Sequence, residues 1–212
     1  SAKRGIALMM ATSLLSIAGA LGIARGLEGG VEEWYPTVVI WAGALFLLTN
    51  YESSGPYSLR LKDRGLPGNV AISLSVGMLV LFGAAGVFEP FNLRAWSMFV
   101  VGVLYTLARE IVKDIEDMEG DKGRSTYAMR VGPEKARTVA WIIMLLTFAS
   151  LLMPFGIGVF PELHLLGVIP AVILLLMVKG RLMASEDHAA QQLIKKSMYL
   201  ALAAFLGSSL LA

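Results

Sequence analysis

The chain has 212 residues, of which 56% are hydrophobic and 16% charged, with a net charge of +2 and a mean hydropathy of +0.68. Soluble domains carry about a quarter charged residues, so this composition excludes a water-soluble fold. The absence of cysteine excludes disulfides, thiolate metal sites and cysteine nucleophiles. The sequence therefore predicts an all-α, multi-pass transmembrane helix bundle that forms a single domain over residues 1–212.

Seven apolar stretches are long enough to be spanning helices, because about 20 helical residues cross a hydrocarbon core of roughly 30 Å. In chain order they are residues 4–25, 35–51, 68–88, 93–113, 137–155, 161–180 and 189–211. Glycine and proline inside these stretches, such as Gly77 and Pro170, are common in spanning helices, where close helix packing tolerates them.

The distribution of charge predicts the orientation of the helices. If the seven helices alternate in direction, sixteen of the eighteen basic residues fall at one membrane face, and Arg25 and Arg94 fall at the other. The positive-inside rule assigns the basic face to the cytoplasm. We therefore expect a multi-pass protein of the cell membrane whose longest connections, residues 52–67 and 109–136, are cytoplasmic. Eleven of the sixteen acidic residues also lie at this face, which predicts polar chemistry there.

The segment that follows the fourth predicted span is acidic, since six of the twelve residues 110–121 are Asp or Glu. If the helix continues, Asp114, Asp117 and Asp121 are spaced i, i+3, i+7 and share one face. Three such carboxylates repel one another unless a cation lies between them. Oxygen ligands suit Mg²⁺, which proteins commonly hold through one or two carboxylates plus the phosphates of a substrate. The alternative interpretation is a solvated acidic turn at the membrane surface.

The connection before the third predicted span supplies cations, because Arg60, Lys62 and Arg64 lie within five residues. Arg can bind two phosphate oxygens with its forked guanidinium, and Lys offers a point charge. This loop is therefore predicted to hold a diphosphate against the metal site at the same membrane face. The alternative is that these residues are ordinary anchors that contact anionic membrane lipids. For Asn69, just beyond the loop, a helix N-cap is a commoner role than a ligand, and neither role is predicted.

These two connections resemble the UbiA superfamily of intramembrane prenyltransferases. Residues 113–121, Lys-Asp-Ile-Glu-Asp-Met-Glu-Gly-Asp, resemble its second aspartate-rich motif. Residues 57–62 and 66–69 resemble its tyrosine-lysine loop and the Gly-Asn that opens the next helix, and residues 126–132 also fit. Within the superfamily, Arg109-Glu110 ahead of the acidic motif is most similar to archaeal digeranylgeranylglyceryl phosphate synthases.

The resemblance implies an enzyme of isoprenoid and lipid biosynthesis that transfers an isoprenyl group from an isoprenyl diphosphate to a lipid or aromatic acceptor, with Mg²⁺ as cofactor. For this subfamily the implied reaction is geranylgeranyl transfer to geranylgeranylglyceryl phosphate in archaeal phospholipid synthesis. The implied catalytic residues are Asp114, Asp117, Asp121 and Lys62, and the three aspartates are also the implied metal ligands. The implied diphosphate-binding residues are Tyr57, Arg60, Lys62, Arg64, Arg109 and Lys113.

The resemblance also implies a nine-helix bundle with two aspartate-rich motifs and a lipid-open cavity for the hydrocarbon tail. The first motif, Asn-Asp-x-x-Asp-x-x-x-Asp, is missing, because no Asn-Asp dipeptide occurs in the sequence. We therefore expect two N-terminal helices and this motif to precede the present residues. Residues 121–126 are shorter than the family pattern, which suggests that a small stretch is missing there too.

Other functions stay open at this point. A 4-hydroxybenzoate or quinone-precursor polyprenyltransferase would need the same diphosphate site, so the acceptor is not determined. A small membrane transporter would need ionisable groups or broken helices near the bilayer midplane, where this sequence has almost no charge. A non-catalytic membrane subunit could dock a basic partner on the acidic loop. No nucleic-acid partner is expected.

Overall fold

The computed structural model describes residues 2–24, 31–52, 58–120 and 125–211. Over these residues the chain forms helices and turns and no strand. The seven long helices are α1 (Ala2–Ala24), α2 (Val31–Glu52), α3 (Leu66–Gly86), α4 (Leu93–Glu116), α6 (Pro133–Gly156), α7 (Leu165–Met183) and α8 (Asp187–Leu211). The short elements are α5 (Tyr127–Val131) and the 3₁₀ helices η1 (Leu61–Asp63), η2 (Asp117–Glu119) and η3 (Glu162–His164). The all-α prediction is confirmed, and each predicted span overlaps one long helix.

Five of the long helices, within the described residues, are long and apolar enough to cross a membrane: α3, α4 with η2, η3 with α7, α6 and α8. Their outward-facing side chains are large and apolar, as at Leu79 of α3, Leu146 of α6 and Ile173 of α7. Such exposed apolar faces are unfavourable in water but match the hydrocarbon of a bilayer. The chain is therefore a multi-pass membrane bundle.

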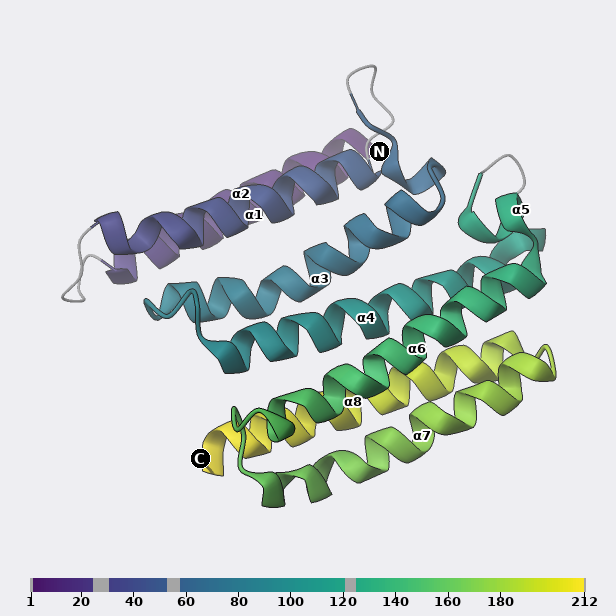
Figure 1. Ribbon diagram of the computed structural model, residues 1–212. Coiled ribbons are helices and arrows are strands. Elements are labelled where there is room, and N and C mark those ends of the chain that lie inside the picture. Colours follow the sequence, from purple (N-terminus) through teal and green to yellow (C-terminus); the bar gives the residue numbers. More distant parts are fainter. Residues whose placement is uncertain (1, 25–30, 53–57, 121–124, 212) are drawn as a thin grey trace.

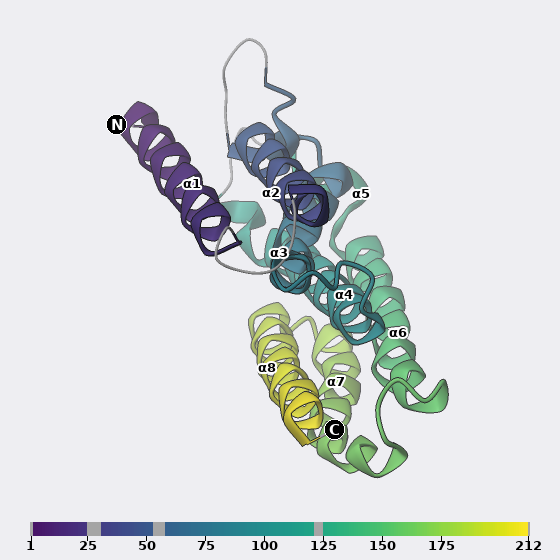
Figure 2. The ribbon, with the colours of Figure 1, turned by 90° about the vertical axis from the view of Figure 1, so that its left-hand side faces the viewer.

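The helix α4 lies at the centre of the bundle, where it packs against α3, α6 and α8. Its buried positions recur every three or four residues, at Val101, Tyr105, Ala108, Val112 and Ile115. The facing helices present alanines that are completely buried, at Ala136, Ala140 and Ala190. Small residues allow spanning helices to approach closely, so these helices associate through van der Waals contacts between complementary surfaces. Figure 2 shows α1 at the edge of the bundle, beside α2.

A buried hydrogen-bond chain links three helices in the interior. The Ser197 hydroxyl of α8 donates to the Ala171 carbonyl of α7 at 2.6 Å, and the Tyr105 hydroxyl of α4 lies 2.7 Å from the same Ser197 oxygen. Because Ser197 has one proton and gives it to the carbonyl, Tyr105 donates to Ser197. Polar groups in a bilayer need such internal partners.

Alternation of the long helices brings several connections to one end of the bundle, on the right of Figure 1. We call it the polar end: it comprises the start of α1 and the connections α2–α3, α4–α6 and α7–α8. The two connections that were predicted to carry chemistry therefore lie at the same end. Arg94, at the start of α4, lies at the opposite end, as predicted.

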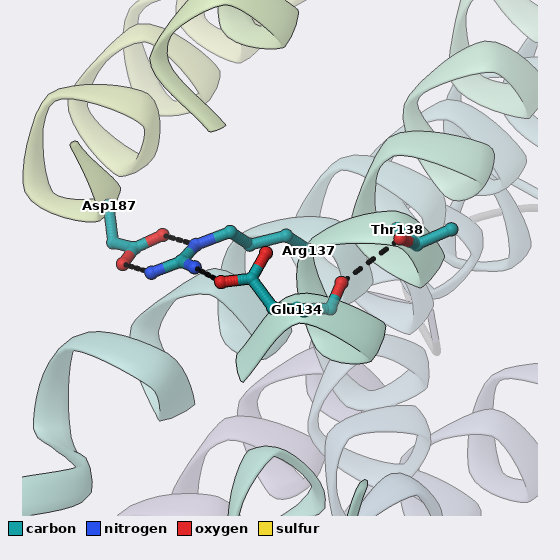
Figure 3. A network of polar contacts seen from close by, with 4 residues as sticks. All are labelled: Glu134, Arg137, Thr138 and Asp187. Atoms are coloured by element: carbon teal, nitrogen blue, oxygen red, sulfur yellow. Dashed lines mark hydrogen bonds and ion pairs between the residues drawn. The ribbon is translucent and has the colours of Figure 1, made fainter. Parts of the chain in front are cut away.

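An ion pair ties α6 to α8 at the polar end (Figure 3). Arg137 donates from Nε and Nη2 to the two carboxylate oxygens of Asp187, at 2.8 and 2.6 Å. Its Nη1 donates to Glu134 at 2.6 Å. The side chains of Arg137 and Asp187 are each only 12% exposed, so this bidentate pair is largely withdrawn from water.

We expect Asp187→Asn to lower the free energy of unfolding by about 3 kcal/mol, because it leaves the nearly buried guanidinium with only the exposed Glu134 as a charged partner. Glu186→Gln is the control, since it removes the neighbouring carboxylate, whose pair with Arg181 is about half exposed. An exposed pair contributes at most about 1 kcal/mol, so this variant should unfold almost like the parent. Denaturant unfolding in detergent micelles measures the free energy of unfolding of both variants. Equal losses would contradict the inference that the buried pair contributes more stability than the exposed pair.

Candidate active site

The first turn of α3, next to the cationic loop, contacts the acidic end of α4, and the loop itself contacts α5. Asn69, in the first turn of α3, donates from Nδ2 to Oδ2 of Asp114 at 2.9 Å. Arg130 of α5 donates from Nη2 to the backbone oxygen of Asp63 at 3.0 Å. The predicted proximity of the two connections is therefore confirmed, and hydrogen bonds join them.

The loop is shaped by a close approach between η1 and the first turn of α3. A Cβ atom on Gly68 would lie 2.2 Å from the backbone oxygen of Leu61, so only glycine fits there. Gly65 has φ +68°, a conformation that L side chains rarely adopt. A Cβ on Gly65 would also lie 3.3 Å from the Cα of Tyr127 in α5. The two glycines therefore hold the cationic segment tightly against α3 and α5.

The three cations of this loop occupy different environments. Arg60 is exposed and has a left-handed backbone conformation, with φ 46° and ψ 49°. Lys62 lies in η1, is half-buried, and has its Nζ 6.0 Å from the centre of the Tyr51 ring. Arg64 follows η1 and is exposed. The predicted site residue Tyr57 lies outside the described residues.

The α-helical continuation under which the three aspartates would share one face ends within the acidic motif. The α-helix ends at Glu116, and Asp117 begins the 3₁₀ helix η2, with its N–H donating to the Ile115 and Lys113 carbonyls. Short 3₁₀ turns of this kind are common at the C-terminal ends of α-helices. Asp114 and Asp117 are both half-buried, whereas Lys113 is exposed. The third predicted ligand, Asp121, lies outside the described residues.

Arg109 is at the inner edge of the polar end of α4. Its Nη1 donates to Oε1 of the neighbouring Glu110 at 2.9 Å. Its Nε is buried and has no hydrogen-bond partner among the described residues. An unpaired N–H in a dry environment is costly, so this group is a local source of instability.

Two contacts of the site were not predicted from the sequence. Asn69 does not take the N-cap role that is common for asparagine, because Gly65 occupies that position and the Asn69 side chain reaches Asp114. His188 of α8 has Nδ1 2.7 Å from Oε1 of Glu116, which ties α8 to the acidic end of α4. The signal for Asn69 was its position inside a predicted span, where a buried amide requires a partner.

The described oxygen donors at the end of α4 are too few to hold Mg²⁺ without further ligands. The described residues contain no cluster of three or more His, Cys, Asp or Glu side chains that could hold a metal by themselves. Asp114 and Asp117 offer carboxylate oxygens on adjacent turns, and Mg²⁺ is commonly held by one or two carboxylates with substrate phosphates completing its shell. These residues therefore fit a Mg²⁺–diphosphate complex better than a metal held by protein alone.

An apolar cavity of about 320 Å³ lies between α1, α2 and α3. Its walls include Met9, Ile40, Trp41, Leu45, Met78 and Phe82. Met78 is nine residues beyond Asn69 on α3, which places the cavity roughly 14 Å further into the bundle than the site. Such a space suits a hydrocarbon chain rather than a polar ligand.

Comparison with known proteins shows the family to which the chain belongs. Residues 1–205 match the UbiA prenyltransferase family. The chain belongs to this family. Curated relatives of this UbiA chain are named digeranylgeranylglyceryl phosphate synthase. No solved structure matches the chain.

Three of these relatives show how much of each protein is covered. The protein from Haloquadratum walsbyi is 35% identical over 147 residues, which are 67% of this chain and 51% of the relative. The protein from Thermococcus kodakarensis is 33% identical over 194 residues, 89% and 68% of the two chains. The protein from Halobacterium salinarum is 31% identical over 189 residues, 88% and 67%. The UbiA chain thus spans about half to two thirds of the length of these relatives.

Proposed function

We propose that this chain is part of an intramembrane prenyltransferase that transfers an isoprenyl group from an isoprenyl diphosphate to a lipid acceptor. The observation that carries the proposal is the first turn of α3 at the polar end, where Asn69 contacts Asp114 and Gly68 packs against the backbone of the cationic loop at Leu61. A diphosphate needs both halves, because its oxygens bind cations directly and bind carboxylates only through a metal. Membership of the UbiA prenyltransferase family supports the same chemistry.

In this scheme Asp114, Asp117 and Asp121 hold Mg²⁺, which would supply positive charge against the departing diphosphate. The cationic loop binds the diphosphate oxygens on the side away from the aspartates, through Lys62, Arg60 and Arg64. Arg109 and Lys113 add positive charge at the end of α4. Charges that are already in place when the diphosphate leaves lower the barrier, because no reorganisation is required.

The bond between C1 of the isoprenyl chain and the diphosphate oxygen breaks, and its electron pair leaves with the diphosphate. The acceptor hydroxyl oxygen then bonds to C1 and gives its proton to an oxygen of the released diphosphate. The apolar cavity between α1, α2 and α3 would take the hydrocarbon tail. An apolar surrounding keeps water from reacting with the electron-poor carbon.

We further propose that the isoprenyl donor is geranylgeranyl diphosphate and that the acceptor is geranylgeranylglyceryl phosphate. The names of the curated relatives support this pair. We also place the polar end in the cytoplasm, because the basic residues gather there and the positive-inside rule assigns such a face to the cytoplasm.

A transfer assay with radiolabelled geranylgeranyl diphosphate and full-length protein tests the proposal. We expect lipid-linked product with Mg²⁺ and geranylgeranylglyceryl phosphate, and none when EDTA replaces Mg²⁺. Parallel arms with 4-hydroxybenzoate and a quinone precursor test the acceptor. Product in one of those arms alone would reassign the acceptor, whereas no turnover with any acceptor would favour a non-catalytic membrane subunit.

A further inference from the structure

Asn69 is a buried amide at the contact between the two halves of the site. Its residue is 6% exposed, its N–H donates to the Gly65 carbonyl at 3.2 Å, and its carbonyl accepts from the Ser73 hydroxyl at 2.6 Å. Its backbone is therefore held by the first turns of α3. The side chain leaves this turn and donates to Oδ2 of Asp114 on α4. Because a carboxylate can only accept, the amide nitrogen must be the atom that faces it.

The chemical nature of this contact matters for a carboxylate that binds a cation. A neutral amide fixes the orientation of the carboxylate without neutralising its charge. A lysine at the same position would form an ion pair and oppose the binding of a second cation. Metal-ligating carboxylates are commonly oriented by such hydrogen-bonded neighbours.

Gly68, the residue before Asn69, lets the same turn of α3 contact the cationic loop as well. The absence of a Cβ lets the Leu61 carbonyl, and with it the segment that carries Lys62, lie against this turn. Consecutive helical residues point about 100° apart, so the cationic segment and Asp114 contact different sides of one turn. The first turn of α3 therefore acts as the spacer between the cationic and acidic halves.

We propose that Asn69 is a positioning residue, which orients the Asp114 carboxylate for a divalent cation while its neighbour Gly68 seats the cationic loop. The proposal rests on the proposed function, since it assumes that Asp114 contributes to a Mg²⁺–diphosphate site. It adds a residue that would not touch the substrate and acts through Asp114.

The test measures thermal stabilisation of full-length, detergent-purified protein during a Mg²⁺ titration, with a non-hydrolysable geranylgeranyl thiodiphosphate present. Asn69→Ala should raise the Mg²⁺ concentration for half-maximal stabilisation by roughly 10- to 100-fold, as loss of an orienting neighbour does at other metal sites. In an Asp114→Asn background the same change should have no further effect, because coupled residues are not additive.

Asn69→Asp provides a second variant of nearly the same size. It removes the donor and sets two carboxylates side by side, so the Tm without Mg²⁺ should fall below that of the parent. Because a divalent cation relieves this repulsion, the rise in Tm on adding Mg²⁺ should exceed that of the parent.

Tyr105→Phe is the matched control, because it removes another buried bond from α4, to Ser197, nine residues or about 14 Å along the helix from Asp114. It should lower the Tm without moving the Mg²⁺ midpoint. The positioning role would be overturned if the Mg²⁺ midpoint of Asn69→Ala equalled that of the parent. It would also be overturned if Tyr105→Phe shifted the Mg²⁺ midpoint as much as Asn69→Ala does. A parent with no Mg²⁺-dependent stabilisation at all would overturn the proposed function and this inference with it.

Discussion

Asp114→Asn and Asp117→Asn are each expected to lower Mg²⁺-dependent prenyl transfer by about 100-fold or more, a loss typical of removing one preorganised charge from a reaction centre. Both substitutions keep the size of the side chain, and both side chains are half-buried at the end of α4. The expected loss follows from charge alone, because an amide cannot replace a carboxylate as a strong Mg²⁺ ligand. The measurement is the initial rate of labelled product at saturating substrate over a range of Mg²⁺ concentrations.

Glu119→Gln is the matched control for this pair. It removes one negative charge from the same turn, η2, but from an exposed side chain that is not among the predicted ligands. Its rate should stay within about twofold of the parent, because exposed charges are screened by water and salt. If Glu119→Gln loses as much activity as Asp117→Asn, the acidic turn contributes a general negative field and the assigned ligands are wrong.

Gly68→Ala is the second substitution with a large expected effect. The added methyl group would lie 2.2 Å from the Leu61 carbonyl oxygen, so the loop or the first turn of α3 must move by about 1 Å. A displacement of that size near a reaction centre can reduce the rate about 100-fold, and here it shifts Lys62 relative to Asp114. We expect a higher KM for the isoprenyl diphosphate together with a lower kcat.

Gly83→Ala tests whether any alanine in α3 has this effect. Gly83 has no atom within 4 Å of the added Cβ, so the substitution meets open space. Alanine favours a helix by up to about 1 kcal/mol over glycine, so this variant should be fully active and at least as stable as the parent. Full activity in Gly68→Ala would show that the cationic loop can shift without consequence for transfer.

The spanning helices could be predicted from the sequence because the bilayer itself imposes their length and composition. Hydropathy nevertheless misplaced several ends. The helix α6 begins at Pro133 rather than at residue 137, since its first turn carries Glu134 and Lys135 outside the hydrocarbon. The short helix α5 was missed, because five residues capped by Thr126 give too little periodicity to detect.

The candidate site could be predicted in part, from the side chains that a diphosphate and Mg²⁺ require. The motif pointed to Asp114, Asp117 and Lys62, and the charge asymmetry placed both connections at one membrane face. The roles of all these residues, Asp121 and the other cations included, stay predictions. The contact of Asn69 with Asp114 could not be foreseen, because the two residues are 45 positions apart and nothing local links them.

The sequence by itself determined that this protein is an all-α membrane bundle with a basic, carboxylate-rich end, because composition, span length and charge asymmetry act locally along the chain. The tertiary structure alone decided how close the cationic loop and the acidic helix end lie to each other. That distance depends on the absence of a side chain at Gly68 and on the reach of one amide from α3 to α4. Both are consequences of packing between helices, which no single segment encodes.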